Sequence, residues 1–167
     1  MTTLAVTESL DLKEVFSKFP TGVAAISAMV RGVPKGLVAS SFTVGVSMDP
    51  PLVSFSAQHT STTWPVLRNA ERIGVSILGS QQQQTCLRMA SRRPDKFDDI
   101  LHNVNDQGAI IIPGCSLWLE CSVFAELPAG DHSVILLKVE SAHAYSDNSP
   151  IILHDSLFKF LEAPIAV

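Results

Sequence analysis

The chain has 167 residues, 46% of them hydrophobic, with 12 basic and 16 acidic side chains and a formal net charge of −4. This length can bury one core and is too short for two independent domains, so we expect a single domain over residues 1–167. The basic side chains form no continuous stripe that could follow a phosphate backbone, which argues against nucleic acid as a partner.

The N-terminal stretch MTTLAVTESLDLKEV carries three acidic residues where a secretory signal would need basic residues and then an apolar core. No apolar run elsewhere approaches the length of a membrane span. We therefore expect a soluble, cytoplasmic protein. Its three cysteines lack the C-x-x-C spacing of a zinc site, so we expect structural thiols in a reducing compartment and no metal.

The first predicted element is a helix over about residues 8–19, because SLDLKEVFSKF places most of its apolar residues on one helical face. Thr7 or Ser9 could cap its start, and Pro20 ends it. The segments GVAAISAMV and GLVASSFTVGVS then predict two paired strands, joined by a hairpin loop RGVPKG (31–36). MDPPLVSFSA predicts a turn that leads into a third strand.

The next segments predict a helix, a strand, a second helix and a polar connection. TSTTWPVLRNA predicts a short helix, with Pro65 in its first turn, and ERIGVSIL predicts a strand. In SQQQQTCLRMAS, Ser80 stands three residues before Gln83, which is the spacing of a capping box at the start of a helix. The polar connection RRPDKFDDILHNVNDQG (92–108) shows no clear period, and connections of this length are usually functional or mobile.

The last third of the chain predicts a long β-hairpin, because CSLWLECSVFAEL and HSVILLKVESAHAY flank the turn PAGD. PIILHDSLFKFLE supplies a final strand. The sequence predicts about seven short strands and two interposed helices. A parallel sheet would require a regular alternation of strands and helices, which this order lacks. We therefore expect a mainly β fold, a mostly antiparallel barrel over about residues 20–160.

Hydroxyl side chains gather where strands end and a helix starts: Ser40, Ser41 and Thr43, and then Thr60, Ser61, Thr62 and Thr63. Such a helix start suits a phosphate group, although ordinary N-capping explains the same residues. Arg92, Arg93 and Lys96 could bind the same anion or form a solvated loop. His132 at the hairpin turn is either a functional or an ordinary surface residue.

Five segments resemble, in order and approximate spacing, those of the flavin reductase family: FPTGVAAIS, GLVASSFTVGVSMDPPLVSFS, TSTTWPVL, RRPDKFDD and GDHSVILLKVES. The resemblance covers roughly residues 14–155. It implies an FMN-binding split β-barrel, an antiparallel barrel with a few short flanking helices. It also implies a homodimer that binds FMN or FAD, reduces it with NADH or NADPH and supplies the reduced flavin to a partner monooxygenase.

The resemblance also implies roles for particular residues. His132 would stand beside the nicotinamide as the catalytic residue, and Phe97 could pack near the flavin ring. Ser61 and Thr62 would receive the flavin phosphate. The residues implied to contact flavin are, in full, Thr21 and Gly22 at the pocket edge, Ala39, Ser40, Ser41, Phe42 and Thr43 along the ring and ribityl chain, Ser61 and Thr62, and Arg92, Lys96 and Phe97 on the loop.

Several alternatives stay open at this point. A protein of the same barrel could carry flavin without turning over NAD(P)H, or use bound flavin on another substrate as pyridoxamine-phosphate oxidases do. A β-barrel interaction module without ligand is a third possibility. The resemblance does not choose between FMN and FAD or between NADH and NADPH, and it gives His59 and His154 no role.

Overall fold

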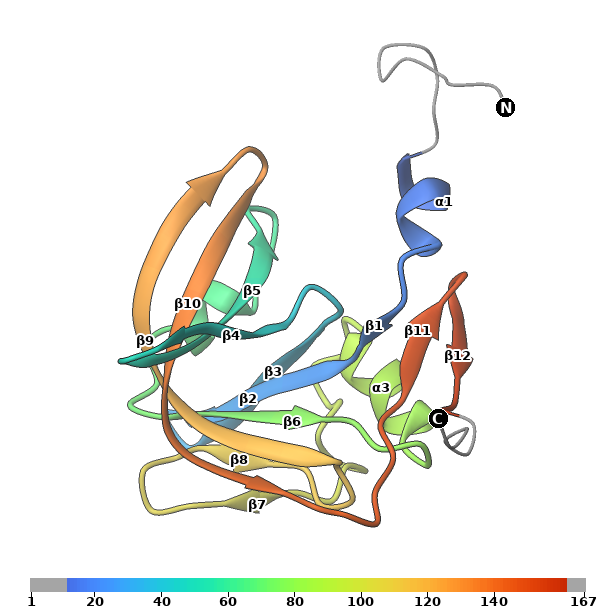
Figure 1. Ribbon diagram of the computed structural model, residues 1–167. Helices are drawn as coiled ribbons and strands as arrows, with labels where there is room; N and C mark the ends of the chain where they lie inside the picture. Colours follow the sequence, from blue (N-terminus) through green and yellow to red (C-terminus); the bar gives the residue numbers. More distant parts are fainter. Residues whose placement is uncertain (1–11, 162–167) are drawn as a thin grey trace, which may run out of the picture.

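The structure is a computed structural model that describes residues 12–161 (Figure 1). Helix α1, Leu12–Ser17, buries none of its side chains and stands apart from the main sheet. It lies within the helix expected over about residues 8–19, whose start and proposed caps, Thr7 and Ser9, lie outside the described residues. Among residues 12–161, no helix is long and apolar enough to cross a membrane.

The main sheet has seven strands in the order β3-β2-β6-β9-β10-β5-β4, and every neighbouring pair is antiparallel. Its strands are β2 (Ala24–Val30), β3 (Val33–Ala39), β4 (Thr43–Met48), β5 (Pro51–Gln58), β6 (Ile73–Ile77), β9 (Leu117–Ala129) and β10 (His132–Ala144). The two end strands, β3 and β4, follow one another in the chain, and the sheet curls into an open barrel (Figure 1). The expected mainly β, antiparallel fold is confirmed.

Smaller elements complete the fold. β1 (Thr21–Gly22), β11 (Ile152–His154) and β12 (Leu157–Lys159) form a three-stranded sheet, and β7 (Asn103–Val104) pairs with β8 (Ile110–Ile111). The two further helices are α2 (Trp64–Leu67) and α3 (Gln83–Ala90). Both fall where the sequence predicts a helix, and Pro65 is in the first turn of α2 as expected.

Strand β2 is buried on both faces, which explains its unbroken apolar run. Ala24, Ile26 and Ala28 belong to the main core, where the rings of Phe55 and Trp64 meet edge to face at 5.2 Å. The alternate residues of the same segment, Val23 and Ala25, belong to a second core that contains Met89, Phe97 and Ile151. Since successive side chains of a strand point to opposite faces, only a segment that is apolar throughout fits between two cores.

Two predicted strand boundaries were wrong. The loop of the first hairpin is Arg31 and Gly32 alone, both at positive φ (51° and 76°), and Val33–Gly36 already belong to β3. A two-residue turn with both residues at positive φ matches the twist of the strands better than a longer loop does. The predicted strand GLVASSFTVGVS is in fact β3 and β4, interrupted at residues 40–42.

The end of the chain and the polar connection also differ from expectation. The predicted final strand is a hairpin of β11 and β12, with Asp155 and Ser156 at positive φ in its turn. The short strands β7 and β8 were not predicted, because a two-residue pairing leaves no period in the sequence.

The predicted capping box at α3 was wrong as well. The N-cap position is Gln82, and its side chain makes no cap hydrogen bond. The Gln82 amide instead accepts a hydrogen bond from the Gly79 N–H at 2.8 Å and donates one to the Pro113 carbonyl at 2.7 Å. Gln82 therefore ties together two loops that are distant in the sequence.

The cysteines agree with the expectation of structural thiols. Cys86, Cys115 and Cys121 are buried and unpaired. Burial raises the pKa of the Cys121 thiol to about 12, with Glu140 and Glu120 adding to the shift. These thiols therefore stay protonated and have little nucleophilic character at neutral pH.

Candidate functional site

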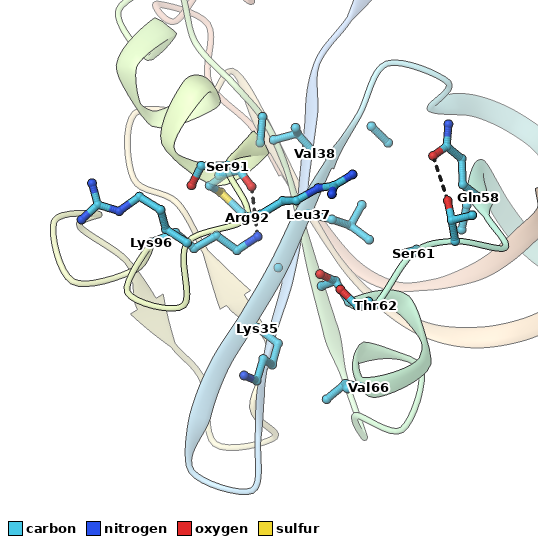
Figure 2. A pocket seen from close by; sticks show the side chains of 18 of the residues that line it. Lys35, Leu37, Val38, Gln58, Ser61, Thr62, Val66, Ser91, Arg92 and Lys96 are labelled. Atoms are coloured by element: carbon cyan, nitrogen blue, oxygen red, sulfur yellow. Dashed lines mark hydrogen bonds between the residues drawn. The ribbon is translucent and has the colours of Figure 1, made fainter.

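A cavity of about 900 Å³ opens along β3 and collects residues from five parts of the chain (Figure 2). None of the described aspartates or glutamates lines it, although the chain as a whole is acidic. Its lining is Pro34–Ser41 from β3 and the turn after it, Ser56–Gln58 from β5, Thr60–Thr63 and Val66 around α2, Met89–Pro94 and Lys96 from α3 and the following loop, and His132 from β10.

The floor of the cavity is β3, an end strand of the main sheet. Gly36 lies at its centre, and a Cβ built there would come within 2.8 Å of Met89 Cε and of Phe97 Cζ. The absence of a side chain at Gly36 therefore lets α3 and the loop that follows it pack directly on the strand. Leu37 and Val38 add apolar surface, so the floor can support a flat ring.

Hydroxyl groups border the cavity opposite α3. Ser41 Oγ accepts a hydrogen bond from the Ser56 N–H at 2.9 Å, which holds the interrupted segment between β3 and β4 against β5. Ser61 Oγ accepts one from the Trp64 N–H at 3.2 Å, so Ser61 takes part in capping α2. Thr62 makes no hydrogen bond to a described residue. Since α2 has only four residues, its dipole is small, and the polar character of this border comes from the hydroxyls.

Cations border the cavity on the α3 side. Lys96 Nζ donates a hydrogen bond to the Met89 carbonyl at 3.1 Å. Burial, and then the nearby Lys35, lowers the pKa of Lys96. Arg93 is paired with Asp95, with guanidinium nitrogens 3.0 and 2.7 Å from the two carboxylate oxygens. Arg92, in contrast, makes no ion pair with a described residue.

His132 stands where β10 begins and pairs in register with Gln58, which lies across the cavity from Lys96 (Figure 2). Its side chain is 34% exposed, and its Nδ1 lies 2.7 Å from Oδ1 of Asp131. The pKa of Asp131 is lowered, first by the hydrogen bond from His132 and then by the charge of His132. The carboxylate is therefore ionised at neutral pH. An ionised partner favours a proton on Nδ1, which leaves Nε2 available for a ligand.

His59 lies beside this pair. Its backbone N–H donates to the Asp131 carbonyl at 2.9 Å, and its Nε2 lies 3.3 Å from Ser133 Oγ. These contacts connect the end of β5 to the hairpin turn that carries His132. His59 thus has a structural position, but it does not line the cavity.

Most of the residues expected to bind flavin come together in the cavity. Those that line it are Ala39, Ser40, Ser41, Ser61, Thr62, Arg92, Lys96 and His132. Their contacts with a ligand remain predictions, but the structure gathers them from segments that are far apart in the sequence.

The other expected residues lie elsewhere. Thr21 and Gly22 form β1 and pair with Leu153 and Ile152 of β11. Phe42 packs against the main core, and Phe97 is buried in the second core beneath Gly36. Thr43 is exposed on β4. Any contact of these five with flavin stays a prediction.

Sequence reasoning missed Lys35, Gln58, Val66 and Met89, which also line the cavity. For Lys35 a signal existed, because strand alternation places it on the same face as Leu37 and Ala39. The error in the position of the first hairpin turn hid this signal. Met89 could not have been found, since it reaches the cavity only through the contact of α3 with β3.

Comparison with known proteins gives the class to which this fold and cavity belong. The family model of the flavin reductase like domain matches residues 16–162. A flavin reductase of Pseudomonas putida is 35% identical over 143 residues, 85% of this chain and 84% of that protein. An NADH:FMN oxidoreductase of Rhodococcus qingshengii is 31% identical over 153 residues, 89% of this chain and 79% of that protein.

Solved structures agree. The NADH:FAD oxidoreductase of Streptomyces globisporus C-1027, in complex with NAD and FAD fragments, superposes with a TM-score of 0.89 at 27% identity, and the alignment covers 100% of both chains. A nitrilotriacetate monooxygenase component B homologue from Mycobacterium thermoresistibile gives a TM-score of 0.85 at 31% identity, over 93% of this chain and 90% of that one. The chain belongs to the flavin reductase family. The expected family and its oxidoreductase class are therefore confirmed.

Proposed function

We propose that the chain binds FMN or FAD in the cavity along β3 and reduces it with NADH or NADPH. One observation carries the proposal. A single cavity free of lining carboxylates holds Lys96 and Arg92 at one end, an apolar floor, and the His132–Asp131 pair at the other end. An anionic cofactor with a flat ring fits this distribution of charge and apolar surface.

The chemistry supplied by the bound groups is transfer of a hydride from the nicotinamide to the flavin ring. The protein's task is to hold two flat rings face to face at about 3 to 3.5 Å and to anchor their phosphates. Leu37 on β3 supports one ring face. Lys96, Arg92 and the hydroxyls of Ser61 and Thr62 hold the flavin phosphate.

His132 orients the second ring. Asp131 fixes the imidazole through Nδ1, so Nε2 can donate or accept a hydrogen bond at the nicotinamide end of the cavity. Because hydride transfer itself needs no proton at this position, we assign His132 a binding and orienting role in contact with the substrate.

We also propose that the protein works as a homodimer and delivers reduced flavin to a monooxygenase. β4 ends the main sheet, so within residues 12–161 one of its edges pairs with no strand. Val44, Val46 and Met48 alternate along it, and Met48 is 84% exposed. A second copy of the chain would cover this apolar edge. The buried free cysteines suit a reducing compartment, which supports the cytoplasm as the location.

Oxidation of NADH and of NADPH by the purified protein, without flavin and with added riboflavin, FMN or FAD, tests the proposal. A rate that saturates with added flavin supports a reductase. Flavin that binds but is not reduced by either nucleotide would contradict it, and would favour a flavin carrier or an oxidase of another substrate.

A further inference from the structure

Three cations lie around one part of the cavity wall without partners of opposite charge. Arg92 and Lys96 come from the loop after α3, and Lys35 comes from β3 (Figure 2). Lys35 and Lys96 are both half-buried. Neither the Lys35 nor the Arg92 side chain makes an ion pair or a hydrogen bond with a residue in the described range 12–161, and no described carboxylate lines the cavity.

The neighbouring basic residues are neutralised by the loop itself. Arg93 forms its two-pronged pair with Asp95, and Arg88 lies 2.7 Å from Asp99. Asp95 and Asp99 are thus engaged by these two arginines, and neither carboxylate lines the cavity. Basic side chains usually pair with a carboxylate that lies within reach. No described carboxylate pairs with Lys35 or Arg92, so these two cations of the cavity wall differ from Arg88 and Arg93.

Lys35 and Lys96 line the same cavity (Figure 2), and their like charges repel each other. After burial, the charge of Lys35 is the second cause that lowers the pKa of Lys96. The Lys96 ammonium makes one hydrogen bond to a described residue, the Met89 carbonyl, and has two more protons to donate. An anion placed between the two lysines would relieve the repulsion and accept these protons.

The two lysines approach from opposite faces of β3. Lys35 points to the same face as Leu37, which packs with α2 in the main core. The loop of Lys96 packs on the other face, where Gly36 contacts Met89 and Phe97. Because β3 ends the main sheet, both side chains can reach around its edge. A single phosphate monoester needs only Lys96, Arg92 and the hydroxyls, which leaves Lys35 for a second phosphate.

We propose that Lys35 and Lys96 form a clamp for the diphosphate of a dinucleotide, with one phosphate at each lysine. Lys35 is thereby a binding and specificity residue of the reductase site. The clamp rests on the proposed function, since it presupposes that a flavin occupies the cavity. Two ligands of the reaction carry a diphosphate, FAD and the pyridine nucleotide, and the test separates them.

The test compares the wild-type protein with Lys35→Met, which removes the charge and keeps an unbranched apolar stem, and with Lys35→Arg, which keeps the charge. Lys159→Met on β12 is a matched control, because it removes an exposed lysine that does not line the cavity. Fluorescence titration gives the Kd of riboflavin, FMN and FAD. With FMN saturating, the KM for NADH and inhibition by ADP-ribose report on the pyridine nucleotide.

If FAD is the ligand of the clamp, Lys35→Met weakens FAD binding about five- to tenfold, changes FMN binding less than about twofold and leaves riboflavin unchanged. If the pyridine nucleotide is the ligand, the KM for NADH and the ADP-ribose inhibition constant rise together by about the same factor. In either case Lys35→Arg restores most of the affinity, Lys159→Met has no effect, and the loss shrinks as salt is raised.

Two results would overturn the clamp while leaving the reductase intact. If Lys35→Met loses equal affinity for FMN and FAD, Lys35 binds the phosphate that both flavins share and not a second phosphate. If the Kd and KM of every ligand are unchanged, Lys35 contacts none of them. A wild-type protein that binds no flavin at all would overturn the proposed function and the clamp with it. Thermal unfolding of each variant confirms that the comparisons involve folded protein.

Discussion

His132 and Asp131 form a hydrogen-bonded pair at the turn of the β9–β10 hairpin, with 2.7 Å between Nδ1 and Oδ1. Asp131 is 92% exposed, so the pair lies at the mouth of the cavity and is accessible to a ligand from solvent. The hairpin turn therefore presents an oriented imidazole to the end of the cavity opposite the lysines.

Asp131→Asn removes the charge that orients His132 and keeps the size of the side chain. We expect the KM for the pyridine nucleotide to rise about two- to fivefold, because a pair this exposed contributes modestly, while the flavin Kd is unchanged. Steady-state kinetics at saturating flavin measure both effects. An equal rise in the flavin Kd would instead place Asp131 near the flavin.

The pKa of Asp131 is lowered, so its carboxylate protonates only at pH values below the ordinary range for aspartate. The pair is therefore intact at neutral pH and weakens as pH falls through the lowered pKa. As pH falls, we expect the KM of the wild-type protein for the pyridine nucleotide to rise. Because the pKa of Asp131 is lowered, this rise should begin at a lower pH than it would for a carboxylate with an ordinary pKa. In Asp131→Asn, this rise of KM at low pH should be absent. If the rise persists in the variant, a group other than Asp131 causes it.

Lys96 has a lowered pKa because of burial and the charge of Lys35. It therefore loses its proton at a lower pH than an ordinary lysine, and its attraction for a phosphate decreases as pH rises through that lowered value. We expect binding of FMN and FAD to weaken toward alkaline pH relative to riboflavin, which has no phosphate. In Lys96→Met, binding of FMN and FAD should be weaker at neutral pH. As pH rises, the Kd values of FMN and FAD in this variant should change in parallel with the Kd of riboflavin.

Gly36→Ala should disturb the cavity and the second core together. The new Cβ would lie within 2.9 Å of Met89 Cε, Phe97 Cζ and Ser27 Cβ. Met89 and Phe97 must shift to make room, and Ser27 Cβ is held by the backbone of β2, so we expect a loss of about 1 to 3 kcal/mol in the free energy of unfolding together with weaker flavin binding. Denaturant unfolding and flavin titration of the same variant provide the measurement. A stable variant with normal flavin binding would contradict the close packing of α3 on β3.

Gly74→Ala should destabilise the barrel without direct contact with the cavity. The added Cβ would lie 1.9 Å from the Ile110 carbonyl oxygen, a backbone atom that cannot turn aside. We expect a loss of more than about 3 kcal/mol in the free energy of unfolding, or no folded protein. Gly22→Ala is the matched control, because no atom of the described residues, its chain neighbours aside, lies within 4 Å of its Cβ position. It should change stability by less than about 0.5 kcal/mol.

The Gly22→Ala control also tests the expected role of the Pro-Thr-Gly corner. This corner lies in β1, outside the cavity lining, so we expect flavin binding to be unchanged in the variant. A marked loss of flavin affinity would show that β1 contacts the ligand in spite of its position in the described chain.

Local signals in the sequence predicted the elements that depend on local chemistry. The β9–β10 hairpin follows from two apolar runs around Gly130, and α2 follows from polar residues before Trp64 and Pro65. The resemblance to flavin reductases added the residues that gather in the cavity, including His132, Lys96 and Ser61. These residues are far apart in the sequence, and no local pattern relates them to one another.

The errors arose where tertiary contacts decide the outcome. Ser80 and Gln83 have capping-box spacing, but Gln82 holds the Gly79 and Pro113 loops and Ser80 takes no part in a side-chain cap. The burial of Phe97 in the second core was likewise not visible in the sequence, because it depends on the missing Cβ of Gly36; its contact with the flavin ring stays a prediction. Lys35 was overlooked because the predicted hairpin loop covered residues 31–36, whereas Lys35 belongs to β3.

The proposed reaction is the reduction, by pyridine nucleotide, of a flavin held in the cavity along β3. Anaerobic stopped-flow mixing of flavin-loaded protein with NADH or NADPH, followed by flavin absorbance, tests it most directly, with His132→Ala as the comparison. We expect bleaching of the flavin in the wild-type protein at a rate that saturates with nucleotide, and in His132→Ala a slower rate or a higher half-saturating concentration. A flavin that stays oxidised in the wild-type protein with both nucleotides would contradict the account.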